Sequence, residues 1–188
     1  GFRPAEIAGL RVRAGARTSR DVILQIAALV EEIDVSPPVE DTQRMVNDYY
    51  DLVTDFYELG WGPSFHFAPR FRDESLAASL TRHQHYLAAA LSLRPSMRVL
   101  DAGCGIGGPL CAIHRFSGAT MVGLNNNAYQ VERARQRIRE GGCERGCAVV
   151  HGSFMAIPEP DASFDAAIAI EALCHASDRT ACFREISR

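Results

Sequence analysis

Four glycines within six residues, at positions 103, 105, 107 and 108, constrain this chain more than any other feature. They follow the apolar segment 97–100 and Asp101, and they precede the helix-like segment 109–116. Glycine lets a backbone turn sharply and approach a ligand closely, and the first turn of a helix offers free N–H groups to an anionic group. The pattern predicts a strand, a ligand-binding loop and a helix, with a nucleotide-like cofactor in the loop.

The same alternation of strand and helix continues downstream. Strands are expected over 120–124, 148–151 and 165–170, with helices over 128–140 and after Ser177 or Asp178, either of which would serve as an N-cap. Such alternation implies a parallel sheet with right-handed crossovers. We predict an α/β fold with about four parallel strands. This sheet is incomplete for its type, so we expect further chain beyond Arg188 and expect the fragment alone to be poorly soluble or inactive.

The first part of the chain is helical in pattern. Apolar residues recur at helical spacing over 21–33, 41–59 and 73–93, and prolines follow the first and the last of these segments. We therefore divide the chain into an N-terminal extension (1–40), a helical substrate-binding region (41–93) and a C-terminally truncated cofactor-binding domain (94–188).

Composition excludes several classes of function. The formal net charge is -3 and Lys and Arg form no long run, so no nucleic-acid partner is expected. The apolar stretches fall short of the about 18 residues of a membrane span, so any membrane contact would be peripheral. The six cysteines make no C-x-x-C pair and no zinc spacing with His, so we expect reduced intracellular thiols and no metal.

Two observations identify the cofactor. The spacing Gly103-x-Gly105-x-x-Gly108 also fits a dinucleotide-binding loop, but that site needs an acid about 20 residues on, where this chain has asparagines at 125–127. Asp101, two residues before the first glycine, places a carboxylate where it could face the cationic amino-acid end of S-adenosylmethionine. We therefore predict S-adenosylmethionine as the cofactor.

Segments 101–109 and 122–130 together resemble the sterol 24-C-methyltransferase family. Segment 57–67 is similar to the family motif Y-E-Y-G-W-G-x-S-F-H-F, and segment 170–176 is similar to I-E-A-T-C-H-A. The resemblance runs from about Met45 to the end of the chain. Leu59, Leu173 and Ser153 depart from it.

The resemblance implies a Rossmann-like class I methyltransferase sheet and methyl transfer to carbon 24 of a sterol side-chain double bond, in sterol biosynthesis. It also implies a sterol substrate and an intracellular location, in the cytoplasm or at the periphery of the endoplasmic reticulum membrane, and it is compatible with a homo-oligomer. Two alternatives stay open: a methyltransferase for another prenyl-derived lipid, and a non-catalytic remnant that binds cofactor or sterol.

The reaction class assigns roles to substrate-facing side chains. Attack on a double bond leaves a cation, which aromatic faces stabilise, and the predicted substrate-binding rings are Tyr57, Trp61, Phe65 and Phe67. A base must then remove a proton, and the catalytic candidates are Glu171, His175, Glu58 and His66.

The remaining candidates would bind the cofactor. Asp101 is expected at its methionine end, Gly103, Gly105 and Gly107 along its carboxylate and ribose, and Asn125 at the ribose hydroxyls with help from Gln130. Ser153 stands where the resemblance implies an aspartate that grips the adenine amino group, so the neighbouring Phe154 is expected to contribute through packing.

Overall fold

The computed structural model describes residues 39–188, of which 43–188 form one compact unit. Its elements are α2 (Val39–Trp61), α3 (Leu76–Ala90), β1 (Arg98–Ala102), α4 (Gly108–Ser117), β2 (Thr120–Asn125), α5 (Ala128–Glu140), β3 (Cys147–His151), β4 (Ala166–Ile168), the short 3₁₀ helix η1 (Leu173–His175) and α6 (Arg179–Ile186). The helix expected over 21–33 lies outside the described residues.

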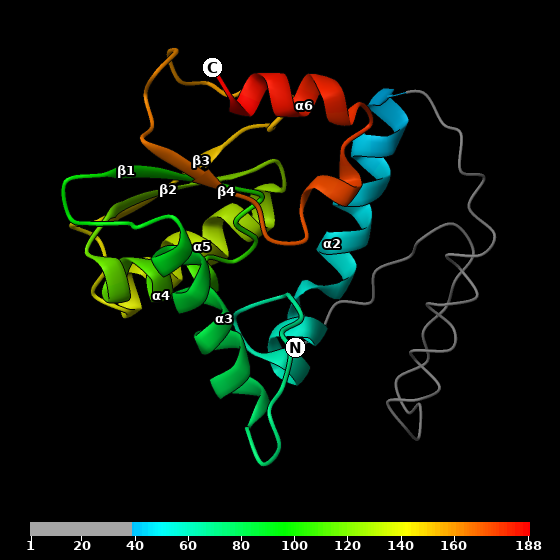
Figure 1. Cartoon of the computed structure of the whole chain (residues 1–188). Helices are drawn as coiled ribbons and strands as arrows, with labels where there is room; N and C mark the ends of the chain where they lie inside the picture. Colours follow the sequence, from blue (N-terminus) through cyan, green and yellow to red (C-terminus); the bar gives the residue numbers. More distant parts are fainter. Residues whose placement is uncertain (1–38) are drawn as a thin grey trace, which may run out of the picture. The chain divides into compact units, whose positions relative to one another are not determined.

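The four strands form one parallel sheet in the order β3-β2-β1-β4, which confirms the predicted α/β architecture. Asp101 near the end of β1 is in register with Gly123 of β2 and Ile168 of β4. Parallel strands bring their carboxyl ends to the same edge, where sheets of this kind bind ligands. The loop after β1 and the segments after β2, β3 and β4 therefore meet at this edge (Figure 1).

Alternate residues of the strands supply two cores. Val99 and Met121 pack with Ile113 of α4 and Val131 of α5 on one face of the sheet. The opposite face is built differently. There, Leu100, Leu124 and Ile157 pack with Phe164 and with Ile186 of α6. The helices α4 and α5 accordingly lie on one side of the sheet and α6 on the other (Figure 1).

Local caps set the element boundaries. The helix expected over 73–93 begins only at Leu76, because Ser75 caps it by accepting a hydrogen bond from the N–H of Ala78. It ends at Ala90, just before Ser92, which has a positive φ of 52°. Asp178, one of the two expected caps, accepts from the N–H of Ala181 at the start of α6.

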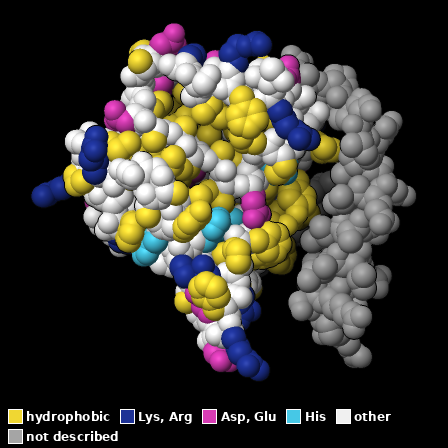
Figure 2. Space-filling view, in the orientation of Figure 1, with side chains coloured by type: hydrophobic (Ala, Val, Ile, Leu, Met, Phe, Trp, Pro, Cys, Tyr) yellow, Lys and Arg dark blue, Asp and Glu magenta, His cyan; other side chains and the backbone are white. Residues whose placement is uncertain are grey.

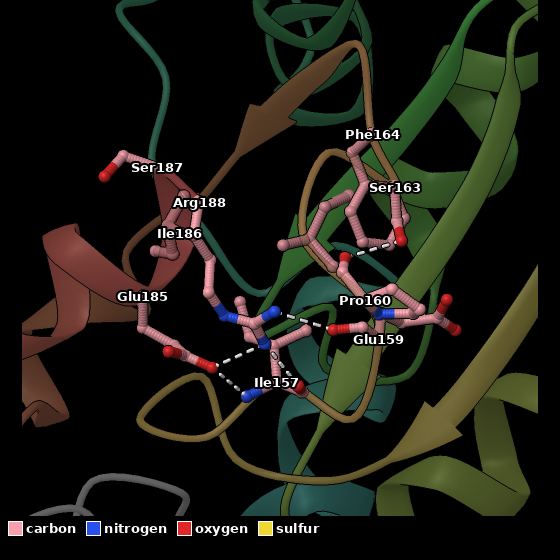
Figure 3. A pocket seen from close by; sticks show the side chains of 10 residues that line it. Ile157, Glu159, Pro160, Ser163, Phe164, Glu185, Ile186, Ser187 and Arg188 are labelled. Atoms are coloured by element: carbon pink, nitrogen blue, oxygen red, sulfur yellow. Dashed lines mark hydrogen bonds and ion pairs between the residues drawn. The ribbon is translucent and has the colours of Figure 1, made fainter.

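Arg188 fastens α6 to the loop after β3. Its guanidinium donates to the carbonyl oxygens of Ile157 at 2.6 Å and Glu159 at 2.8 Å, and to the carboxylates of Glu185 and Asp161. Figure 3 shows Arg188 with Ile157, Glu159 and Glu185 around a small pocket of about 80 Å³. None of the predicted site residues lines that pocket, so it is not the expected cofactor site. No helix within residues 39–188 has the length and hydropathy needed to span a membrane.

Candidate cofactor and substrate site

The glycine loop is tied to the end of the neighbouring strand. The backbone N–H groups of Gly103 and Cys104 both donate to the carbonyl oxygen of Leu124, at 2.8 and 3.1 Å. Gly103, Gly105 and Gly107 have φ values of 84°, 53° and 78°, a region that side chains other than glycine adopt only with strain. Glycine is therefore required for the path of the loop.

Two other segments pack closely against this loop. A Cβ atom at Gly103 would lie 2.3 Å from Cβ of Ala172, and one at Gly108 would lie 2.1 Å from the carbonyl oxygen of Pro63. A Cβ at Gly105, by contrast, would meet nothing within 4 Å. The loop thus touches both segments that the sequence assigns to substrate and base, and it is open at Gly105.

Asp101 is a buried acid with an unsatisfied oxygen. The residue is 2% exposed, and no described residue bonds its Oδ2 atom. Burial raises the pKa of its carboxyl to about 7, because the charged form loses hydration without gaining a partner. A cationic group beside Asp101 would supply that partner. The buried acid and the open space at Gly105 therefore fit the amino-acid end of S-adenosylmethionine.

The amides of Asn125 and Gln130 form a chain of hydrogen bonds from the loop to α2. Asn125 Nδ2 donates to the carbonyl oxygen of Gly105 at 3.2 Å and to Gln130 Oε1 at 2.8 Å. Gln130 Nε2 then donates to Oγ1 of Thr54 at 2.9 Å, while Asn125 Oδ1 accepts from the N–H of Asn127 at 3.1 Å. Most of the bonding capacity of these amides is therefore used within the protein, and Gln130 acts through Asn125.

Ser153 and Phe154 follow the third strand of the site edge. Ser153 Oγ accepts from the backbone N–H of Met155 at 3.1 Å, so the hydroxyl stabilises its own turn. Phe154 is half-buried, and its Cε1 atom lies 4.0 Å from the position of a Cβ at Gly103. The ring of Phe154 thus lies beside the glycine loop.

A polar hollow opens at the carboxyl ends of β2 and β3. It is lined by Asn47, Asp51, Asn126, Asn127, Ala128, Tyr129 and His151. These residues come from α2 as well as from the segments at the ends of the two strands. The helix α2 therefore forms one wall of this hollow, at the carboxyl edge of the sheet where we expect the cofactor. No residue predicted from the sequence lines this hollow.

The four predicted aromatic residues form one cluster. The Tyr57 ring lies 5.5 Å from Phe65 and 6.4 Å from Trp61, and Trp61 lies 4.8 Å from Phe67, between ring centroids. Tyr49 joins them through a 2.5 Å hydrogen bond between its hydroxyl and that of Tyr57. Phe67 is 68% exposed. Figure 2 shows hydrophobic side chains gathered beside the C-terminal part of α2.

Glu171 lies against this aromatic cluster. Its Oε1 atom accepts a 2.7 Å hydrogen bond from the backbone N–H of Phe67, and its side chain is otherwise exposed. Its φ of 52° is in the left-handed region, which costs a non-glycine residue on the order of 1 kcal/mol. The Phe67 bond and the contact of Ala172 with Gly103 hold this strained residue in place.

His175 contacts a tyrosine that the sequence did not single out. Its Nε2 atom lies 3.1 Å from the hydroxyl of Tyr50, and the two rings meet edge to face with centroids 5.6 Å apart. Burial lowers the pKa of His175 and raises the pKa of Tyr50 to about 12. Both groups are therefore neutral near pH 7.

His66 is fully engaged inside the protein. It is 1% exposed; its Nδ1 lies 2.8 Å from the carbonyl oxygen of Phe67 and its Nε2 lies 2.8 Å from Nε2 of Gln84. The pairing requires Nδ1 to carry the proton and Nε2 to accept from the Gln84 amide. Burial lowers the pKa of His66. The ring therefore positions segment 66–67.

Glu58 is occupied by two ion pairs. Its two carboxylate oxygens accept from the guanidinium groups of Arg133 and Arg137 on α5. This double ion pair joins α2 to α5, and both oxygens of Glu58 are occupied. The structure thus brings Glu171 and His175 to the site edge, but places Glu58 in the contact between two helices.

Sequence reasoning missed the polar face of α2. Asp51 Oδ1 accepts from Asn127 at 2.7 Å, and Asp55 Oδ1 accepts from the hydroxyl of Tyr129 at 2.6 Å. Together with Glu58, these acids recur at helical spacing opposite the apolar stripe of α2. The helical spacing of these acids in the sequence could have indicated that the polar face of α2, like its apolar face, contacts the rest of the protein.

Comparison with known proteins places the chain among methyltransferases. Residues 100–188 match the family described as methyltransferase domain. The chain is 54% identical over 144 residues to cycloartenol-C-24-methyltransferase of Arabidopsis thaliana. This match covers 77% of this chain and 43% of that protein. It is 46% identical over 159 residues to sterol 24-C-methyltransferase of Yarrowia lipolytica, covering 85% and 42% respectively. The chain thus spans about two fifths of the length of these curated relatives.

Solved structures share the fold. The crystal structure of the 4+2 cyclase SpnF has a TM-score of 0.71 and 30% identity, covering 77% of this chain and 54% of that one. The cyclopropane synthase MmaA2 from Mycobacterium tuberculosis has a TM-score of 0.62 and 26% identity, covering 75% and 48%. Because these proteins differ in the reactions their names describe, the shared fold positions a site without choosing its substrate.

Proposed function

This chain belongs to the sterol 24-C-methyltransferase family, and from that premise we propose that it methylates carbon 24 of a sterol side-chain double bond. S-adenosylmethionine is the methyl donor. The observation that carries the proposal is the buried carboxyl of Asp101, whose Oδ2 atom has no described partner, directly before a glycine loop that two substrate-side segments contact.

The residues of the cofactor edge hold the donor in orientation. Asp101 binds the ammonium of its methionine end, the backbone around Gly103 and Gly105 approaches it closely, and Phe154 packs beside the loop. When bound, the cofactor supplies a sulfonium methyl group that needs no further activation. The contribution of the protein is therefore orientation, exclusion of water and management of charge.

The helical region 41–93 provides the sterol side of the proposed site. Rings such as Tyr57, Trp61 and Phe67 contact one another and offer apolar faces to the side chain. Methyl transfer to a double bond leaves positive charge on the sterol. Aromatic faces stabilise such charge by about 0.5–2 kcal/mol each where water is excluded.

Glu171 is the proposed base, and His175 is a positioning residue. No described residue donates to Oε2 of Glu171, whereas Oε1 accepts from the N–H of Phe67 at the aromatic cluster. Oε2 thus takes the proton that the sterol cation must lose. The contact of Tyr50 with His175 fixes the segment that follows Glu171 against α2.

Transfer of a labelled methyl group tests this proposal. The full-length protein is incubated with radiolabelled S-adenosylmethionine and a panel of sterols with and without the side-chain double bond, together with prenylated quinones. We expect label only in sterols that bear the double bond. Label only in the quinones would identify a methyltransferase for another prenyl-derived lipid, and cofactor binding without any transfer would identify a non-catalytic remnant.

A further inference from the structure

Three buried cysteines from separate segments meet on the face of the sheet that α4 and α5 cover. Cys111 lies in α4, Cys143 in the turn after α5 and Cys147 at the start of β3, and they are 3%, 3% and 6% exposed. Their sulfur atoms lie within 4.8 Å of one another. The fold thus brings together three thiols whose proximity could not be predicted from their spacing in the sequence.

This distance is close to what a metal ion requires. Three sulfurs bound to one zinc ion at about 2.3 Å in tetrahedral geometry lie about 3.8 Å apart. Shifts of about 1 Å or less per side chain would therefore bring Cys111, Cys143 and Cys147 into coordination. Cysteine sulfur is also the soft ligand that selects thiophilic ions over magnesium or calcium.

We propose that Cys111, Cys143 and Cys147 form a three-thiolate site for a thiophilic divalent cation of the zinc and cadmium class. Each thiol releases its proton to solvent as its sulfur–metal bond forms, and no electron is transferred. The site shares no residue with the cofactor edge. It joins α4, the α5–β3 turn and β3, so an ion there would clamp the layer that supports the glycine loop.

Cadmium titration of the purified, fully reduced full-length protein under anaerobic conditions tests the proposal. Cd²⁺ bound by thiolates absorbs in the ultraviolet, so the titration should saturate at about one ion per chain, as a single site requires. Prior loading with zinc should delay that absorption, because cadmium must then displace an ion held by the same three thiolates. Replacement of any one of the three cysteines by alanine should weaken cadmium binding by about tenfold or more.

Cys182→Ala is the matched control, because this thiol is also fully buried but lies in α6, outside the cluster. It should bind cadmium as the unaltered chain does. Retained binding of S-adenosylhomocysteine would show that each cluster variant is folded. Equal cadmium binding by the folded cluster variants and the unaltered chain would overturn the proposal.

Discussion

At the scale of single residues, the proposed role of Asp101 predicts that cofactor binding depends on pH. Its carboxyl has a pKa of about 7 without a ligand, whereas binding of an ammonium group requires the ionised form. We therefore expect affinity for S-adenosylhomocysteine to fall by about tenfold per unit as pH drops below 7. Asp101→Asn should bind weakly at pH 8 and lose this dependence. Isothermal titration calorimetry across pH 5.5–8, a range that brackets this pKa, measures the affinity of the unaltered protein and of the variant.

The same carboxyl should make the ligand-free protein less stable as pH rises. Its folded-state pKa is raised above the ordinary value of 3.8 to about 7, so the stabilising contribution is complete below about pH 4 and is lost by about pH 7. Asp101→Asn should therefore raise the melting temperature of the ligand-free protein at pH 8. The exposed pair partner Asp48 supplies the control variant Asp48→Asn, which should change neither binding nor its pH dependence.

Glu171→Gln separates the proposed role of this residue as a base from its role in structure. The amide oxygen still accepts from the N–H of Phe67, but glutamine cannot take a proton. We expect kcat to fall by about 10²-fold or more with an unchanged Kd for S-adenosylhomocysteine. The decisive measurement is single-turnover methyl transfer by the full-length enzyme. A variant that turns over at the unaltered rate would remove Glu171 from the proton-transfer step.

At the scale of elements, α2 is held by its polar face as much as by its apolar one. Glu58→Gln would leave Arg133 and Arg137 without their shared carboxylate, and the Nε atoms of both arginines are already buried without a described partner. Loss of hydrogen bonds to charged groups should lower the free energy of unfolding by about 1–3 kcal/mol. Thermal unfolding measures that loss.

Turnover per folded molecule should be unaffected by Glu58→Gln, because both oxygens of Glu58 are engaged with α5. Glu132→Gln on α5 is the control, since Glu132 pairs with Arg135 and Arg139 at the surface and exposed pairs contribute little. A large fall in kcat with normal stability would restore Glu58 as a candidate base.

Periodicity predicted the elements well wherever the segment is regular. The helix over 128–140 and the start of the strand at Thr120 match α5 and β2. The strand expected over 165–170 is shorter, Ala166–Ile168. The apolar run continues past this strand, but Glu171 has a positive φ and η1 begins at Leu173. Hydrophobic pattern alone does not reveal where such a chain leaves the sheet.

At the scale of the whole molecule, local sequence patterns predicted that Asp101 and the glycine loop lie at the carboxyl edge of the sheet, but not how distant side chains pair. The position of Asp101 before the glycine loop followed from local spacing, and the structure places both where a parallel sheet requires. The partners of Glu58 and His175 could not be predicted in this way, because they lie 75 to 125 residues away along the chain. Contacts between residues so far apart depend on how α2 packs against α5 and against segment 171–175, which local sequence patterns do not determine.

The glycine loop couples the segments of the site, and one substitution tests this coupling. Gly103→Ala would place Cβ 2.3 Å from Cβ of Ala172 and would strain a φ of 84°. Gly142→Ala strains a φ of 65°, but its Cβ would meet nothing within 4 Å. Both variants should lose about 1–2 kcal/mol of stability from strain. Only Gly103→Ala should also displace the segment that carries Glu171, and lower kcat/KM for sterol methylation. Equal kinetics for the two variants would mean that the 171–175 segment adapts without cost to the reaction.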